Sequence, residues 1–212
     1  MDDKKNIVNK KDRKIIVFWI FITLFVILTI AVFNGFTHSI DQFIQSFIIS
    51  IRNSHLTSFF TIITNMGGAY ALLAISALLV LIKRDKKRAL LIIFNLFLAF
   101  ITSQLFKLII RRDRPTEIFL VNATGYSYPS GHMLVSTAFY FYIMFLINQH
   151  VNNKFLKIIM FILTTLLVSL IGFSRVYLGV HYMTDIVGGL LLAIAYLMLY
   201  MKITNKFLGG VK

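Results

Sequence analysis

The sequence predicts an all-α, polytopic membrane protein with six transmembrane helices and one further helix at the outer membrane interface. Hydrophobic residues make up 58% of the 212 residues and charged residues only 14%, and the mean hydropathy is +0.81. This composition is far more apolar than a soluble domain of this size requires. The chain also contains several stretches near bilayer length with few or no charges. We expect them to form one domain over residues 1–212.

The expected spans differ in their polar content. The first has no charged residue, and the second has only Asn65 as a strongly polar one. The third, fourth and sixth spans carry Lys107, His132 and Asp185, and the fifth is free of charge. The six expected spans are residues 15–33, 56–82, 89–110, 131–147, 158–173 and 182–201.

Two features, one before the second span and one within it, complete the expected layout. Residues 35–55 have apolar side chains at helical spacing, which indicates a helix at the outer interface. A packing role for this helix is favoured over a role in lipid access. Residues 65–68, which include Gly67 and Gly68, indicate either a break before the second span proper or a close-packing site within a longer span.

The net charge of +14 is distributed as membrane topology requires. With six spans, 16 of the 22 Lys and Arg residues fall on one side, in residues 1–14, 83–88, 154–157 and 202–212. The positive-inside bias assigns this side to the cytoplasm. We therefore expect a basic cytoplasmic N-terminus at residues 1–14, a cytoplasmic C-terminus, no nucleic-acid partner and no obligate protein partner. Since the chain has no cysteine, disulfides and thiolate catalysis are excluded.

The other six basic residues lie against this bias and are Arg52, Lys107, Arg111, Arg112, Arg114 and Arg175. The same topology places His132 and His181 at the outer starts of spans four and six. Ionisable groups are costly at membrane depth, so a chain with so many near its helix ends is expected to use them. Three polar clusters thus meet at the extracytoplasmic face, where we expect a site that handles phosphate.

The first two clusters contain groups that suit an anion. Lys107 and Arg114 are seven residues apart, which puts them on one helix face if the helix continues, although Pro115 disfavours helical geometry at Arg114. An ammonium beside a guanidinium suits phosphate oxygens. Ser130 is a natural N-cap, and Gly131 permits close backbone approach, so the start of span four could face an anion, with His132 beside it.

The third cluster contains Arg175, His181 and Asp185. Because His181 and Asp185 are four residues apart at the start of a helix, the carboxylate can accept a hydrogen bond from one imidazole nitrogen while the other faces a substrate. This is how a histidine nucleophile is oriented. An unpaired carboxylate one turn into an apolar span would cost about 2.5–3.5 kcal/mol, so Asp185 needs a partner.

A metal site is disfavoured, although two histidines and an aspartate could form one. Asp185 is better explained as the partner of His181, and the cations of the three clusters would repel a divalent ion. We therefore expect neither a metal nor another cofactor. Asp113 and Glu117 flank the basic cluster and are best interpreted as solvated loop charges.

Together these residues resemble the type 2 phosphatidic acid phosphatase family. The patterns Lys-six residues-Arg-Pro, Pro-Ser-Gly-His, and Ser-Arg-five residues-His-three residues-Asp fit the family at every position between residues 107 and 185. The six-helix layout is similar to that of the bacterial integral-membrane lipid phosphatases over nearly the whole chain.

The resemblance implies metal-independent hydrolysis of a membrane lipid phosphate through a phosphohistidine. His181 would attack phosphorus, Asp185 would orient it, and His132 would protonate the departing lipid oxygen and then activate water. The phosphate would be held by Lys107, Arg114, Ser130, Gly131 and Arg175. The expected location is the bacterial plasma membrane.

Phosphatidylglycerol phosphate, undecaprenyl diphosphate, phosphatidic acid and diacylglycerol pyrophosphate are candidate substrates. The hypothesis is a broad enzyme that prefers one of the first two, since no feature of the sequence identifies the physiological lipid. Two alternatives from other functional classes remain open at this point. Related phosphate pockets hold vanadate, so a vanadate-dependent haloperoxidase is one. A non-catalytic phospholipid-binding or transport protein is the other, although binding alone does not require the oriented pair His181 and Asp185.

Overall fold

The computed structural model describes residues 2–82, 85–115 and 119–208, with side chains described outside residues 2–11 and 82. These residues form helices and connecting loops, without a β-strand. The helices are α1 (Asp2–Phe33), α2 (His38–Ser50), α3 (Ser54–Met66), α4 (Ala69–Ile82), α5 (Lys86–Ile110), α6 (Gly131–Asn148), α7 (Lys154–Tyr177) and α8 (Met183–Phe207).

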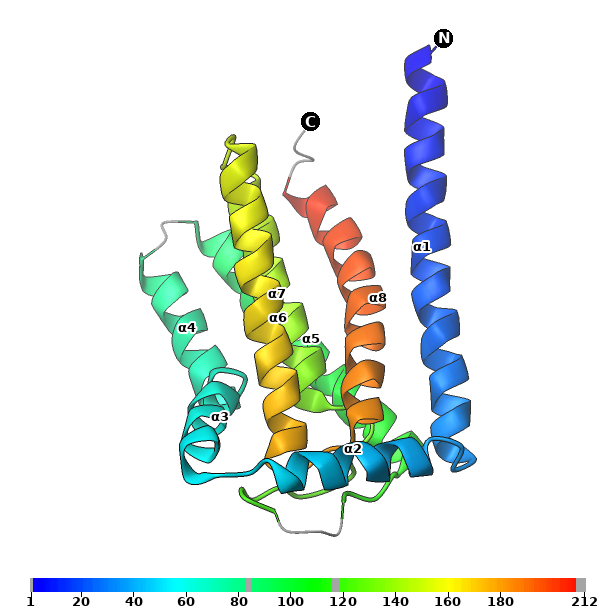
Figure 1. Cartoon of the computed structure of the whole chain (residues 1–212). Helices are drawn as coiled ribbons and strands as arrows, with labels where there is room; N and C mark the ends of the chain where they lie inside the picture. The colour runs from blue at the N-terminus through cyan, green and yellow to red at the C-terminus, as the bar shows by residue number, and fades with distance from the viewer. Residues whose placement is uncertain (1, 83–84, 116–118, 209–212) are drawn as a thin grey trace.

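The helices form an upright bundle, with α2 lying across one end (Figure 1). Within the described residues, five helices are long and apolar enough to cross a membrane: α1, α5, α6, α7 and α8. The pair α3 and α4 passes the same test as one span bent by 47°. The predicted all-α membrane class is confirmed, and the count of six spans holds when this bent pair is one span.

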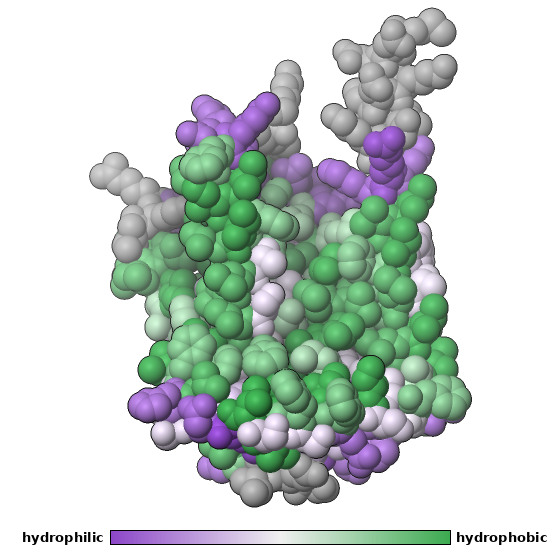
Figure 2. All heavy atoms as spheres, viewed as in Figure 1, coloured by the Kyte–Doolittle hydropathy of each residue, from purple (hydrophilic) through white to green (hydrophobic). Residues whose placement is uncertain are grey.

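Helix α6 lies at the centre of the bundle and packs against α5, α7 and α8, while α1 packs on α8 and α4 packs on α5. The α6 side chains buried in the larger apolar core include Leu134, Ala138, Phe139 and Tyr142. Side chains on the outer faces are apolar and exposed, so a hydrophobic band separates the two polar ends of the molecule (Figure 2). This is the surface that a bilayer requires.

The break between α3 and α4 is both a bend and a close-packing site. Gly67 lies at the break, and a Cβ atom there would come within 2.5 Å of Ile171 Cγ2 and 2.6 Å of Ser136 Oγ. Helices α6 and α7 therefore approach the backbone at the bend more closely than a larger residue would allow. Both interpretations of residues 65–68 apply at once, and the bend brings Gly67 beside His132.

The interfacial helix is shorter than residues 35–55. Gly35 turns the chain before it with a φ of 76°, and Asn53 begins α3 by accepting a hydrogen bond from Leu56 N at 2.9 Å. The buried residues of α2 are Asp41, Gln45 and Ile48. Their helical spacing shows that one face of α2 packs on the rest of the protein.

The bundle separates the charged termini from the polar clusters. Helix α1 begins and α8 ends at one end of the bundle (Figure 1). At the opposite end, beside α2, lie the end of α5, the start of α6, the end of α7 and the start of α8. The helix ends that carry the three polar clusters are thus neighbours in space.

Candidate active site

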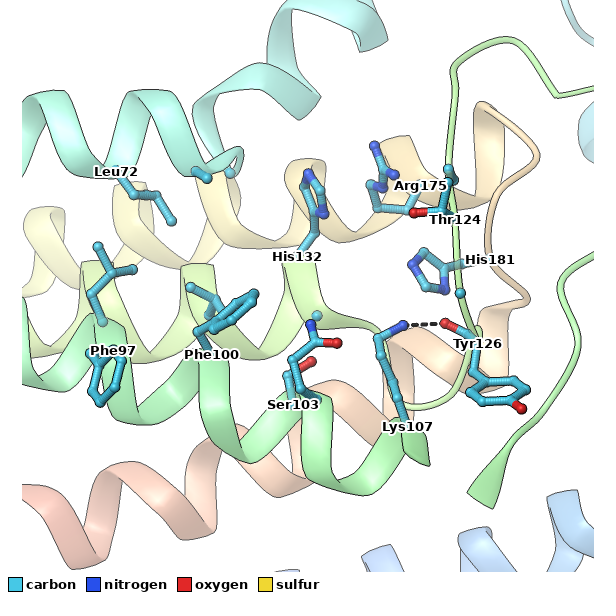
Figure 3. Close-up of a pocket in the computed structure, with 18 of the residues that line it drawn as sticks. Leu72, Phe97, Phe100, Ser103, Lys107, Thr124, Tyr126, His132, Arg175 and His181 are labelled. Carbon is cyan, nitrogen blue, oxygen red and sulfur yellow. Dashed lines mark hydrogen bonds between the residues drawn. The ribbon is translucent and has the colours of Figure 1, made fainter. Parts of the chain in front are cut away.

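The polar clusters line one cavity of about 740 Å³. Lys107, Arg114, His132, Arg175 and His181 contribute to its wall. Figure 3 shows the side chains of Lys107, His132, Arg175 and His181 grouped at one end of this cavity. Gly131 also lines the cavity, so six of the predicted site residues, which lie up to 74 positions apart in the chain, share one space.

The other end of the cavity is apolar. It is lined by residues of α4 and α5, among them Leu72, Phe97 and Phe100 (Figure 3). Leu73, Phe97 and Phe100 also keep about half of their surface exposed, at 55%, 56% and 51%. The cavity therefore continues from the polar end into a groove between α4 and α5 that opens on the hydrophobic band.

His181 and Asp185 form a buried pair at the start of α8. Nδ1 of His181 lies 3.2 Å from Oδ2 of Asp185, and the exposed fractions of the two residues are 2% and 0%. The backbone N–H of Tyr182 donates to the same oxygen at 2.9 Å. Since Nδ1 faces the carboxylate, Nε2 is the nitrogen of His181 available to a bound molecule.

The surroundings of His181 favour its neutral form. Burial is the largest cause that lowers its pKa well below the ordinary histidine value, and the positive charges of Lys107, Arg175 and Arg114 lower it further. A neutral imidazole has a free lone pair, which a nucleophile requires.

Each of the three cations at the cavity has a different support. Lys107 donates to the backbone carbonyls of Tyr126 and Ser127. Arg114 donates to the carbonyls of Gly125, Val180 and Thr124 at 2.7–2.9 Å, so it holds the loop after α5. Arg175 donates from Nη1 to Thr64 Oγ1 at 2.8 Å, while its buried Nε has no partner among the described residues.

The start of α6 closes the polar end of the cavity. Ser130 is the N-cap of α6, and its side chain accepts from Met133 N at 3.5 Å. Its own N–H donates to the backbone oxygen of Asp185 at 3.0 Å, which ties α6 to α8. A Cβ on Gly131 would lie 2.9 Å from Ser103 Oγ and 3.7 Å from Lys107 Cε, so the absence of a side chain leaves the helix terminus open to the cavity.

The helix does not continue from Lys107 to Arg114, in agreement with the disfavoured helical geometry before Pro115. Helix α5 ends at Ile110, and Arg111 adopts a left-handed conformation with a φ of 50°. The loop that follows returns Arg114 to the cavity wall. The two cations meet because of this turn and not because they share a helix face.

Sequence reasoning missed three polar residues around the site. Arg112 donates to Asp185 at 2.6 Å and to Asp41 of α2 at 2.7 Å. Ser103 lines the cavity and has a buried hydroxyl without a partner among the described residues. Arg112 lies against the orientation bias and Asp41 is the only acidic residue of residues 35–55, but neither observation alone identifies a contact.

The described residues contain no cluster of three His, Cys, Asp or Glu side chains suited to a metal ion. Both carboxylate oxygens of Asp185 already accept hydrogen bonds from Arg112, Tyr182 and His181. Asp113 is exposed at the cavity's outer loop, where its backbone oxygen accepts from Ser127 Oγ. Glu117 lies outside the described residues.

Comparison with known proteins gives a consistent result. The sequence profile of the PAP2 superfamily matches residues 88–208. The chain is 30% identical to phosphatidylglycerophosphatase B of Bacillus subtilis (strain 168) over 170 residues, which cover 78% of this chain and 83% of that protein. It is 28% identical to the undecaprenyl-diphosphatase of Sulfolobus acidocaldarius over 185 residues, which cover 82% of this chain and 85% of that one.

A solved structure has the same fold. The crystal structure of a transmembrane PAP2-type phosphatidylglycerolphosphate phosphatase from Bacillus subtilis superposes with a TM-score of 0.81 at 29% identity, covering 88% of this chain and 94% of that chain. The matched residues 88–208 of the PAP2 profile include every polar lining residue from Ser103 to His181.

Proposed function

The chain belongs to the PAP2 superfamily, and from this premise we propose that it is an integral-membrane phosphatase that removes phosphate from a membrane lipid. The substrate is a phosphomonoester or diphosphate of a lipid, and the reaction requires no metal. One observation carries the proposal: a single cavity joins a cationic end that contains two histidines to an apolar groove. Such a cavity suits a molecule with an anionic head and a hydrocarbon tail.

The cationic end binds the phosphate. Lys107, Arg114 and Arg175 supply positive charge, and the open N-terminus of α6 at Gly131 supplies a backbone donor, with Ser130 capping that terminus. Phosphoryl transfer needs mainly positioning and stabilisation of charge on the transferred group. These groups meet both needs and perform the role that a metal ion has in other phosphatases.

His181 is the nucleophile in the first half of the reaction. Its Nε2 lone pair forms a bond to phosphorus while the bond between phosphorus and the lipid oxygen breaks. Asp185 accepts the Nδ1 hydrogen bond and stabilises the positive charge that the ring acquires. His132 donates a proton to the departing oxygen, so the lipid leaves as an alcohol or as a lipid monophosphate.

Water completes the reaction. His132, now without that proton, removes a proton from a water molecule that attacks the phosphohistidine. The bond between nitrogen and phosphorus breaks, inorganic phosphate is released, and the electron pair returns to Nε2 of His181. The presence of both histidines at one end of the cavity supports this division of roles (Figure 3).

The groove between α4 and α5 accommodates the lipid tail, since its walls are apolar and it opens on the surface that faces the bilayer. The relatives' names indicate which lipids to test, because one is a phosphatidylglycerophosphatase and another an undecaprenyl-diphosphatase. Phosphatidylglycerol phosphate and undecaprenyl diphosphate are the preferred candidates, and phosphatidic acid is the third.

Phosphate release in excess EDTA tests this function. The purified protein in detergent is assayed on the three lipids beside His181→Ala and His55→Ala, because His55 is an exposed histidine of α3 outside the cavity. We expect release that resists EDTA, persists in His55→Ala and is lost in His181→Ala. Absence of release on all three lipids, or release that survives His181→Ala, would contradict the proposal.

We also propose that the site faces the outside of the cell, with both termini in the cytoplasm. The excess of basic residues near the termini supports this orientation. Because the chain has no cysteine, single substitutions report on each end of the bundle. In intact cells, a membrane-impermeant maleimide is expected to label Ser54→Cys and not Asn152→Cys. The reverse pattern would contradict the orientation.

A further inference from the structure

Arg112 joins the nucleophile pair to the interfacial helix. Its Nη1 donates to Oδ1 of Asp185 at 2.6 Å, and its Nη2 donates to Oδ2 of Asp41 at 2.7 Å. We infer that Arg112 is a positioning residue that holds Asp185, and through it His181, in the reactive arrangement, and that Asp41 of α2 holds Arg112 in turn. The inference rests on the proposed function and adds Arg112, one of the six residues between Lys107 and Arg114, and Asp41 of α2.

The two oxygens of Asp185 have separate partners. Oδ1 accepts from Arg112, and Oδ2 accepts from the backbone N–H of Tyr182 at 2.9 Å and faces Nδ1 of His181 at 3.2 Å. The carboxylate is fully buried, so its charge requires a partner in place. Donors on both oxygens also prevent the carboxylate from rotating, and this fixes the imidazole ring.

Arg112 does not reach the substrate in this arrangement. Arg114 lines the 740 Å³ cavity, whereas Arg112 is absent from its wall. The guanidinium of Arg112 is occupied by Asp41, Thr184 and Asp185, and it stacks over the Tyr182 ring at 4.3 Å from the ring centroid. An effect of Arg112 on the reaction therefore passes through the groups that it holds, of which Asp185 is the one paired with His181.

Asp41 completes the support from α2. It is only 1% exposed. Its Oδ1 accepts from Thr184 N at 3.1 Å, and its Oδ2 accepts from Thr184 Oγ1 at 2.6 Å as well as from Arg112. Thr184 immediately precedes Asp185, so one side chain of α2 fastens both the first turn of α8 and the loop after α5.

The charge of Arg112 also decides where a proton resides. Burial opposes the charged form of Arg112, but the carboxylates of Asp185 and Asp41 outweigh it and raise its pKa above the ordinary arginine value. A permanent cation beside Asp185 keeps that carboxylate ionised, so the proton of the pair stays on Nδ1 of His181 and Nε2 keeps its lone pair. Without Arg112, buried Asp185 would favour the neutral acid, and the orientation of His181 would be lost.

Substitution of Arg112 tests the inference, and the same substitution of its neighbour Arg111 is the control. Arg112→Gln removes the cation, while Arg111→Gln changes an exposed arginine one position earlier. We expect kcat of Arg112→Gln on the preferred lipid phosphate to fall about 100-fold with little change in KM, because a misplaced nucleophile slows the chemical step and leaves substrate binding intact. Arg111→Gln is expected to match the unaltered protein. An Arg112→Gln protein within about threefold of the unaltered one would overturn the inference.

A double substitution separates positioning from direct substrate contact. If Arg112 acts through Asp185, then Arg112→Gln combined with Asp185→Asn loses no more activity than Asp185→Asn alone. If the two losses multiply, Arg112 acts independently and the inference fails. If Arg112→Gln does not fold, Arg112→Lys and Asp41→Asn provide the same test, and kcat of each is expected to fall about tenfold. Lysine keeps the charge but lacks the forked guanidinium that spans both carboxylates, and Asp41→Asn removes the charge that holds Arg112.

The histidine tautomer gives a readout that needs no substrate. In protein labelled with ¹⁵N-histidine, with His181→Ala for assignment, we expect His181 to carry its proton on Nδ1. Arg112→Gln is expected to shift His181 away from this tautomer, and Arg111→Gln is not. An unchanged tautomer in Arg112→Gln would overturn the inference whether or not the protein hydrolyses lipid phosphates. If the unaltered protein does not hydrolyse lipid phosphates, that result contradicts only the proposed function.

Discussion

Nδ1 of His181 lies 3.2 Å from Oδ2 of Asp185, one helical turn further along the chain, and both side chains are buried. The pair forms because α8 begins at Met183, two residues after His181, so that its first turn carries the carboxylate back to the ring. This relationship fixes which imidazole nitrogen faces the cavity, and the proposed chemistry depends on it.

Asp185→Asn tests the pair directly. An amide cannot stabilise the charge on the phosphorylated ring and permits the wrong tautomer, so we expect kcat to fall about 1,000-fold or more. KM should stay nearly constant, because Asp185 does not contact the substrate. Steady-state phosphate release measures both constants, and an equal loss on replacement of exposed Asp113 by Asn would contradict a specific role.

The acid limb of the pH profile reports on His181. Its lowered pKa means that the neutral nucleophile persists below the ordinary histidine value, so kcat/KM is expected to decline only below about pH 6.5. Lys107→Met removes one of the charges that lower this pKa, and the acid limb should then move to higher pH. Both proteins are assayed on the same lipid, so the substrate's own ionisation cancels, and a shift to lower pH would contradict the assignment.

Filling the groove between α4 and α5 should distinguish substrates by tail length. Leu73 lines the groove, so Leu73→Trp is expected to raise KM about tenfold for a long-chain lipid phosphate and to leave a short-chain analogue unaffected. Leu90→Trp on the exposed face of α5, outside the groove, is the control. Equal changes in KM for the two chain lengths would show that the tail binds elsewhere.

Gly67 is expected to tolerate no larger side chain. A Cβ there would overlap Ile171 and Ser136, and Ile171 is fully buried and unable to move away. Gly67→Val should therefore destabilise the protein by about 1–3 kcal/mol, seen as a lower thermal midpoint in detergent. Ala77→Val on the exposed face of α4 provides the comparison, and equal midpoints for the two variants would contradict the close packing at the bend.

The sequence predicted the spans well because bilayer length and apolar composition constrain them directly. The residues around the cavity could be predicted as a group, because charged and imidazole side chains near helix ends in an apolar chain have few other uses. The start of α6 was also foreseen, since Ser130 and Gly131 carry a local capping signal.

Other features depend on contacts that local patterns do not contain. Arg111 and Arg112 are adjacent and alike, yet the left-handed conformation of Arg111 leaves it exposed and turns Arg112 inward. The link from Asp41 to Thr184 joins residues 143 positions apart. The bend at Gly67 likewise follows from how closely α6 and α7 approach, which is a property of the packed bundle.

Detection of a phosphohistidine would test the central claim most directly. The protein is mixed with a lipid phosphate labelled with ³²P on its terminal phosphate, quenched in alkali within milliseconds, and digested for mass spectrometry. His132→Ala is included with undecaprenyl diphosphate as the substrate, because a lipid monophosphate can leave without a proton from His132, whereas loss of the group that activates water should allow the intermediate to accumulate. We expect an acid-labile phosphate on His181, enriched in His132→Ala and absent from His181→Ala. Turnover without any labelled peptide, or with label that persists in His181→Ala, would contradict the proposed mechanism.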